Sequence, residues 1–263
     1  MATEPAVHRG PYQGALQILR YNWGYYALAV ASAVLAVGLA ALLARPAWFK
    51  VLLSAGAAAA VVWMVSSLAV SHYIYDRSPL YRWQWIAGAL PVAPARWLSI
   101  HAGLDENSPA LRHLFPNAQA VVLDIYDPTE MTEGSIARAR RLSGSDSAAD
   151  RADFRRLPLT EAAFDAVFVI FTAHELRQAA ARESLFCVLR RLLKADGRLL
   201  LVEHLRDLKN LLAFGPGAFH FYPRSEWVRL AVEAGFGIER EFSITPFVRV
   251  FLFTPGPTQS EVA

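Results

Sequence analysis

The sequence predicts an α/β protein, an open sheet with helices on both faces, preceded by a two-helix transmembrane hairpin. Near the N-terminus stand two runs of 20 residues without a charged side chain. Beyond them, short apolar runs alternate with amphipathic stretches, a pattern typical of α/β domains. The hydrophobic content of 54% is above the usual range of about 45–50%, and the excess lies in the two charge-free runs.

The charge-free runs, residues 25–44 and 51–70, each have the length of a membrane-spanning helix. At about 1.5 Å per residue each extends roughly 30 Å, the thickness of the hydrocarbon layer of a bilayer. Tyrosine and tryptophan side chains flank the runs, where the membrane interface favours them. The short link RPAWFK, residues 45–50, predicts a tight turn between the two helices. A cleaved signal peptide and a buried helical pair of a soluble protein are the alternatives.

The distribution of basic residues predicts the topology of the hairpin. Four arginines lie before or after the hairpin, whereas the link between its helices holds one arginine and one lysine. The six residues are Arg9, Arg20, Arg77 and Arg82, and in the link Arg45 and Lys50. Because basic residues stay on the cytoplasmic side, both chain ends are predicted to be cytoplasmic. We therefore expect a multi-pass membrane protein with two spans and a cytoplasmic domain, and the lipid bilayer as a partner.

Charge and cysteine usage narrow the class of the domain that follows. Residues 91–263 carry 20 basic and 21 acidic side chains, so the basic balance belongs to the N-terminal third. A near-neutral domain argues against nucleic acid as a partner. The single cysteine, Cys187, excludes a disulfide framework and agrees with a reducing compartment.

These features divide the chain into five segments. They are an N-terminal cytoplasmic segment (1–24), the hairpin (25–70), an interfacial linker (71–95), the α/β domain (96–254) and a C-terminal tail (255–263). Within the domain we expect strands at Trp97–His101, Ala120–Ile125, Phe164–Ile170, Arg198–Glu203, Ile238–Phe242 and Val248–Phe253, and helices at Pro109–Phe115, Glu133–Leu142, Ala179–Leu193 and Ser225–Ala234. The polar run from 143 to 153 predicts a loop with at most a short edge strand.

The stretch SIHAGLDENSP, residues 99–109, follows the first strand where nucleotide-binding α/β proteins carry a glycine-rich turn. Ser108 and Pro109 predict a helix start, with Ser108 as the cap and Pro109 at the first helical position. The stretch holds a single glycine, Gly103. Asp124 ends the next strand, 21 residues after Gly103, the position at which an acidic side chain accepts hydrogen bonds from ribose hydroxyls.

Further motifs make residues 95–254 resemble the class I S-adenosylmethionine-dependent methyltransferases. In order and spacing these are Asp124, Asp153 before the Leu157-Pro158 pair, FDAV at 164–167, and LKADGRLLLVE at 193–203. The first motif departs from the family, because HAGLDEN replaces a glycine triplet. The resemblance implies a Rossmann-like methyltransferase sheet and S-adenosylmethionine as the cofactor. It also implies that Asp124 holds the ribose, that Asp153 and Phe154 contact the adenine, and that the 99–107 loop, with Ser99, His101, Gly103 and Asp105, takes the methionine end.

Methyl transfer from a sulfonium needs alignment, exclusion of water and in some cases removal of a proton. His174, His204 and His220 are the candidate bases, because His174 and His204 follow the carboxyl ends of predicted strands and a histidine titrates near neutral pH. A structural hydrogen-bonding role is the alternative for each. We expect no metal site, because a ligand set of His174, Glu175 and His204 would need a convergence that the sequence does not indicate.

The apolar stretch NLLAFGPGAFHFYP, residues 210–223, is interpreted as a lid over a lipophilic substrate, as a surface that contacts the bilayer, or as ordinary cover for the sheet. Together these features predict a membrane-anchored methyltransferase that acts on a small hydrophobic or membrane-resident acceptor. Two other functions remain open at this point: a catalytically inactive interaction protein with the same fold, and a nicotinamide-dependent Rossmann-like enzyme.

Overall fold

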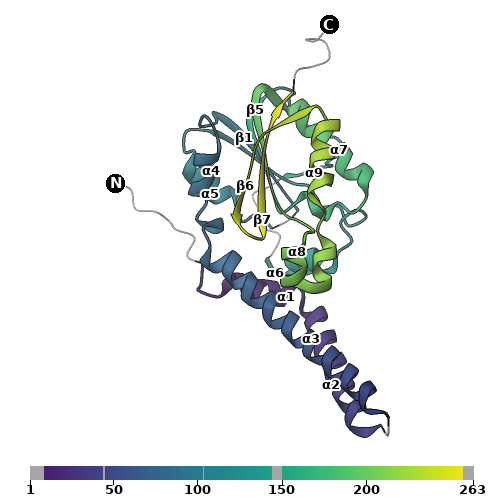
Figure 1. The fold of residues 1–263 in the computed structure, drawn as a ribbon. Coiled ribbons are helices and arrows are strands. Elements are labelled where there is room, and N and C mark those ends of the chain that lie inside the picture. Colours follow the sequence, from purple (N-terminus) through teal and green to yellow (C-terminus); the bar gives the residue numbers. More distant parts are fainter. Residues whose placement is uncertain (1–8, 44, 103, 144–149, 257–263) are drawn as a thin grey trace. The chain divides into compact units, whose positions relative to one another are not determined.

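A computed structural model describes residues 9–43, 45–102, 104–143 and 150–256. The chain forms two compact units. The first contains the chain up to Ser78 together with Leu208–Ala218, and the second contains Pro79–Asp207 and the chain from Phe219 onward. Figure 1 follows the chain through both units.

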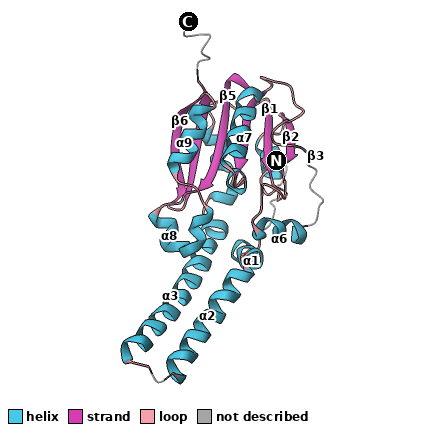
Figure 2. Cartoon of the chain, turned by 90° about the vertical axis from the view of Figure 1, so that its right-hand side faces the viewer, coloured by secondary structure: helices cyan, strands magenta, loops and turns pink. Residues whose placement is uncertain are grey.

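The first unit is helical. Helix α1 (Gln13–Tyr21) leads into α2 (Trp23–Leu42), and α3 (Ala47–His72) continues into the π-helical turn η1 (Tyr73–Arg77). Figure 2 shows α2 and α3 lying side by side. The hydroxyls of Tyr26 and Ser67 join the two helices by a hydrogen bond of 2.9 Å.

Both long helices are candidate membrane spans. The most apolar window of each has a mean hydropathy of 2.0. Of that window, 0% is buried in α2 and 6% is buried in the helical segment that begins with α3. The core helix of a soluble protein would instead be mostly buried, because its apolar side chains pack against other elements. The two candidate helices lie where the sequence has its charge-free runs, and α1 is an additional helix in the predicted N-terminal segment.

Asp76 caps helix α1. Its carboxylate accepts hydrogen bonds from the backbone N–H groups of Gly14 (2.6 Å) and Ala15 (3.1 Å), which the first turn of a helix leaves without intrahelical partners. Gly14 is required here, because a Cβ at this position would lie 2.3 Å from the Cβ of Tyr75.

The apolar stretch 210–223 is divided between the units. Helix α8 (Leu208–Phe214) packs along α3, and the 3-10 turn η4 (Gly215–His220) follows it. Gly215 has a φ of +55°, and a Cβ there would lie 3.0 Å from the ring of Trp63 in α3. The stretch is therefore not only cover for the sheet, because its first part belongs to the helical unit.

The second unit is built on a seven-stranded sheet with the order β3-β2-β1-β4-β5-β7-β6. Its strands are β1 (Arg96–His101), β2 (Gln119–Asp124), β3 (Asp150–Arg151), β4 (Phe164–Ile170), β5 (Leu193–His204), β6 (Phe236–Thr245) and β7 (Val248–Pro255). The pairs from β3 to β5 are parallel, and β7 pairs antiparallel with β5 and β6. This confirms the predicted sheet, including a short edge strand at β3.

Helices cover both faces of the sheet, as predicted. Figure 1 shows α4 (Gln84–Ala89) and α5 (Ser108–Leu114) on one side, and α7 (Ala179–Leu192) and α9 (Arg224–Glu233) on the other. Helix α6 (Gly134–Ser143) follows β2, and the short turns η2 (Leu80–Arg82) and η3 (Ala173–Glu175) complete the unit. On the α7 side, Phe186 and Trp227 join the main core; on the α5 side, Phe115 stacks on Phe168 of β4.

Two local predictions are corrected. Helix α5 begins at Ser108, whose hydroxyl has no hydrogen-bond partner in the described part of the chain; Asp105 caps the helix by accepting from the Ser108 N–H at 2.9 Å. Strand β5 begins at Leu193 rather than at the predicted Arg198, and Gly197 lies inside it, where the β4–β5 register shifts. A Cβ at Gly197 would lie 2.9 Å from the Phe164 carbonyl oxygen, so the bulge needs a glycine.

Candidate active site

The strand order places a candidate ligand crevice at the carboxyl edge of the sheet. From β1 the chain continues to β2 and β3 on one side, and then returns to β4 on the other side of β1. Open α/β sheets bind ligands at such a switch point, because the loops on either side diverge. His101 and Asp124 end β1 and β2 and are direct partners in the parallel register.

Asp124 presents a buried carboxylate at this edge. Its Oδ1 accepts a hydrogen bond from the Tyr126 N–H at 3.0 Å, and its Oδ2 accepts one from Arg140 Nη1 at 2.8 Å. Arg140 also donates to the Ala102 carbonyl at 3.1 Å. Burial lowers the pKa of His101, against the opposing effect of the nearby Asp105 and Asp124 carboxylates. Arg140 is part of the site that the sequence motifs did not indicate.

The loop after β1 is held mainly by its own residues. Asp105 caps α5, Asn107 donates to the Ser99 hydroxyl at 3.2 Å, and the Tyr81 hydroxyl donates to the Glu106 carboxylate. Ser99 is fully buried inside β1. Gly103, the single glycine of the loop, lies outside the described residues.

Asp153 and Phe154, which the resemblance assigns to the adenine, differ in exposure. The Asp153 side chain is 55% exposed, and its Oδ1 accepts from the Arg155 N–H at 2.9 Å. The Phe154 ring is buried in the core, with the Arg155 guanidinium 4.3 Å from its centroid. Asp153 is therefore open to a ligand, whereas Phe154 supports the loop from beneath.

The chemistry of this edge fits S-adenosylmethionine. A carboxylate has about four lone-pair sites. Asp124 uses one for Tyr126 and one for Arg140, which leaves acceptor capacity for the two hydroxyls of a ribose. Asp105 is half-buried in the adjacent loop and carries a negative charge suited to the cofactor's ammonium group.

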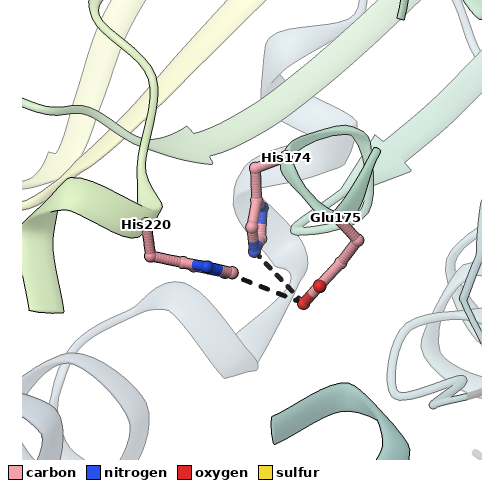
Figure 3. A group of neighbouring side chains, drawn as sticks. All are labelled: His174, Glu175 and His220. Carbon is pink, nitrogen blue, oxygen red and sulfur yellow. Dashed lines mark ion pairs between the residues drawn. The ribbon is translucent and has the colours of Figure 1, made fainter. Parts of the chain in front are cut away.

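A second group of polar side chains gathers after β4. His174 and Glu175 lie in η3, and His220 ends η4. Figure 3 shows both imidazole rings directed toward the Glu175 carboxylate. The Nε2 atoms of His174 and His220 lie 3.5 and 3.9 Å from Glu175 Oε1. We call His174, Glu175 and His220 the 174–220 cluster.

Two further carboxylates stand behind the cluster. Glu203 Oε2, at the end of β5, lies 2.6 Å from His174 Nδ1, and Glu133 Oε1 lies 3.4 Å from His220 Nδ1. Arg177 Nη1 donates to the carbonyls of His174 (3.3 Å) and His220 (2.8 Å). The guanidinium thus fastens together two backbone segments that are far apart in sequence.

Charge interactions within the group shift its pKa values. Burial alone would lower the pKa of His174, but the Glu203 and Glu175 carboxylates raise it to about 10. Burial alone would raise the pKa of Glu175, but the two imidazoles lower it overall. The hydrogen bond from His220 lowers the pKa of Glu133.

His204 lies outside the cluster, in a stack of rings. Its ring stacks on Phe171 at 5.0 Å and on Phe221 at 4.8 Å between centroids, and its Nδ1 lies 2.9 Å from the Phe247 carbonyl oxygen. Burial lowers the pKa of His204 to about 3. Phe171, at the end of β4, has a φ of +50°, a strained conformation for a residue with a Cβ and one that gathers at functional sites.

The structure brings together only some of the histidines that the sequence singled out. His174 and Glu175 share a cluster with His220 and not with His204, which was the third member of the metal set considered from sequence. Glu133, Glu203 and Arg177 are site residues that sequence reasoning missed. A signal existed for Glu203 alone, as the last residue of the LKADGRLLLVE motif.

Comparisons with known proteins bear on the family and the fold of this domain. Residues 102–201 match the family model described as a methyltransferase domain. The sequence matches no curated protein.

Several solved structures share the fold. They include the pyocyanin biosynthetic protein PhzM (TM-score 0.54, 17% identity, covering 97% of this chain and 77% of that one). Human N-acetylserotonin methyltransferase in complex with S-adenosylmethionine has a TM-score of 0.53 at 16% identity, over 94% and 72% of the two chains. The O-methyltransferase NcsB1, in complex with S-adenosylmethionine and 2-hydroxy-5-methyl naphthoic acid, has a TM-score of 0.50 at 16% identity, over 91% and 72%. Residues 102–201 therefore match a methyltransferase domain, and the strand order of the sheet is that of the Rossmann-like fold that these methyltransferase structures share.

Proposed function

We propose that this protein is a membrane-anchored methyltransferase that methylates a hydroxyl oxygen of a small lipophilic acceptor. The observation that carries the proposal is the 174–220 cluster. It places two imidazoles and a carboxylate around one point, at the sheet edge that also holds Asp124. Imidazoles and carboxylates can hydrogen-bond to a hydroxyl group and accept its proton during a reaction.

The cofactor's place follows from the residues at the ends of β1 and β2. S-adenosylmethionine, when bound, supplies a methyl group on a positively charged sulfur. Asp124 would hold the ribose hydroxyls, and Asp153 would contact the adenine from its exposed position. The 99–107 loop, with Ser99, His101, Gly103 and Asp105, would take the methionine end.

The acceptor's oxygen would lie at the 174–220 cluster. As the oxygen–methyl bond forms, the carbon–sulfur bond breaks with its electron pair remaining on sulfur, and the acceptor's O–H proton passes to the cluster. We assign the proton transfer to His220, and we assign His174, whose pKa is raised to about 10 by Glu203 and Glu175, to holding the acceptor's oxygen as a hydrogen-bond donor. His204 is assigned to the ring stack, because its Nδ1 is directed to the Phe247 carbonyl.

A lipophilic acceptor fits the surroundings of the cluster. The Phe171–His204–Phe221 stack lies beside it, and the His174 and Phe221 rings meet edge to face with centroids 6.3 Å apart. Aromatic surfaces of this kind favour flat, apolar ligands. A solved neighbour, NcsB1, was crystallised with a hydroxylated naphthoic acid.

Membrane anchoring is supported by the first unit. Helices α2 and α3 have the length and hydropathy of spans and expose their apolar side chains. Helix α8, packed along α3, exposes Leu208 and Leu212 as well, which suits a helix at the membrane interface. The arginine distribution favours a cytoplasmic location for the methyltransferase domain.

The full chain, reconstituted in lipid nanodiscs, tests the function. With methyl-labelled S-adenosylmethionine and a panel of hydroxylated naphthalenes graded in hydrophobicity, label should appear on oxygen and the rate should rise with hydrophobicity. His174→Gln and His220→Gln should lower turnover by about 10²–10⁴-fold, the usual contribution of acid–base groups, and leave cofactor affinity unchanged. The control is His113→Gln, an exposed histidine on α5. Label on carbon, or full turnover in both cluster variants, would overturn the proposal.

A further inference from the structure

The spacing of the 174–220 cluster is that of metal ligands rather than of hydrogen bonds. Charge-assisted N–H···O bonds are about 2.7–2.9 Å long, whereas Glu175 Oε1 lies 3.5 and 3.9 Å from the two imidazole nitrogens. A tetrahedral ion with bonds of about 2.0–2.1 Å holds its ligand atoms roughly 3.4 Å apart. All three ligand atoms lie within 4.8 Å of one another, so modest side-chain rotation closes the set around an ion.

The outer partners of both histidines are those of metal-binding imidazoles. A metal-binding histidine usually gives its second ring nitrogen to a carboxylate, which fixes the tautomer and the ring orientation. The Glu203 carboxylate is hydrogen-bonded to Nδ1 of His174, and the Glu133 carboxylate lies beside Nδ1 of His220. Both Nε2 atoms are thereby turned toward Glu175, and an ion that binds there would displace the proton from His174 Nε2.

The Glu175 side chain gives an independent indication. Its Oε2 is buried and has no hydrogen-bond partner among the described residues, an expensive condition for a carboxylate oxygen. Three carboxylates, those of Glu133, Glu175 and Glu203, gather here, and the guanidinium of Arg177 lies 3.8 Å from Glu133. A dication bound by neutral imidazoles would offset this negative charge.

From this geometry we propose that His174, Glu175 and His220 bind a divalent transition-metal ion, with Zn²⁺ as the probe. Two nitrogens and one carboxylate oxygen suit zinc, and three protein ligands leave a coordination position open, as in catalytic rather than structural zinc sites. The proposed metal site depends only on these contacts and not on the proposed function. That the open position takes the acceptor's oxygen rests on the proposed function.

Metal binding is measured on the full chain in detergent, purified without a histidine tag and stripped with a chelator. After equilibrium dialysis against Zn²⁺, elemental analysis should find a single ion per chain. Loading with Co²⁺ should produce the visible absorption bands of a site with fewer than six ligands. Neither readout requires S-adenosylmethionine or an acceptor.

Variants test the assignment of ligands. His174→Ala and His220→Ala should each weaken Zn²⁺ binding by at least about 100-fold, and Glu203→Gln, which alters an outer partner, by about 10–100-fold. His220 is partly exposed, so its variant remains informative if His174→Ala fails to fold. The matched control His113→Ala should bind as the wild type does.

The outcomes separate this inference from the proposed function. Absence of stoichiometric Zn²⁺, or equal binding by the folded His220→Ala variant and the wild type, would overturn the metal site. Methyl transfer by the stripped protein would then leave the proposed function standing. Stoichiometric binding lost on ligand substitution supports the metal site, even if no hydroxylated acceptor is methylated.

Discussion

Glu203 holds His174 at two points. One carboxylate oxygen lies 2.6 Å from the ring Nδ1, and the other accepts a hydrogen bond from the His174 backbone N–H at 3.3 Å. Glu203 is fully buried near the end of β5, and His174 follows the neighbouring strand β4. The sheet itself therefore fixes the direction of the imidazole.

This relationship predicts that Glu203→Gln lowers methyl-transfer turnover by about 10–100-fold, a typical effect of altering such a supporting carboxylate. An amide keeps the size of the side chain but not its charge, so His174 is held less firmly. Steady-state kinetics should show the loss in kcat, with the affinity for S-adenosylmethionine unchanged. Glu239→Gln, on the exposed part of β6, is the control. An equal loss of cofactor affinity would instead indicate general damage to the fold.

The second prediction concerns the cofactor. Asp124→Ala removes a charged acceptor from the end of β2, and should weaken S-adenosylmethionine binding by about 1.5–3 kcal/mol, the usual contribution of a hydrogen bond to a charged group. Titration calorimetry on the solubilised chain measures this. Asp127→Ala, three residues further along the loop and partly exposed, should bind normally. Equal affinities for all three proteins would show that the ribose lies elsewhere.

The third prediction is a pH dependence of stability. Burial alone would raise the pKa of Glu226, but hydrogen bonds from Arg182 and Arg229 lower it below the ordinary value of 4.5. At a pH between the lowered pKa and 4.5, the unfolded chain binds more protons than the folded chain does. The stabilisation from Glu226 is therefore present above pH 4.5 and is lost as the pH falls through the lowered pKa. Arg182 also donates to the Leu176 and Arg177 carbonyls, so the loop beside the 174–220 cluster loses support in acid.

Denaturant unfolding at several pH values tests it. In this acid range, Glu226→Gln should lower the slope of the free energy of unfolding against pH by up to about 1.4 kcal/mol per pH unit, which is the contribution of one proton. The control Glu183→Gln alters another, more exposed carboxylate that pairs with Arg229. A slope that Glu226→Gln leaves unchanged would contradict the assignment.

The fourth prediction is the membrane topology. Cys187 is the chain's single cysteine and is exposed on α7, so it reports on the side of the domain without any substitution. A membrane-impermeant maleimide should label it only after lysis of the cells. In a Cys187→Ser background, Ala47→Cys at the start of α3 should be labelled in intact cells. Labelling of Cys187 from outside would reverse the orientation.

Local patterns in the sequence determined the elements. The two charge-free runs predict α2 and α3, because their apolar length is a property of consecutive residues. The apolar runs of the domain predict six strands close to their observed positions, and β4 coincides with the predicted Phe164–Ile170. Asp124 was identified from its place at the end of an apolar strand, which requires no knowledge of distant contacts.

Only the tertiary structure decided which side chains meet. Glu203, His174 and His220 come from three separate segments, and their convergence depends on the pairing of β4 with β5 and on the Arg177 hydrogen bonds to two carbonyls. The sequence places both His174 and His204 after the carboxyl ends of strands, but the chain after β5 stacks the His204 ring between Phe171 and Phe221, outside the 174–220 cluster. Register and packing between distant segments are set by the whole core, so residue spacing along the chain carries no record of them.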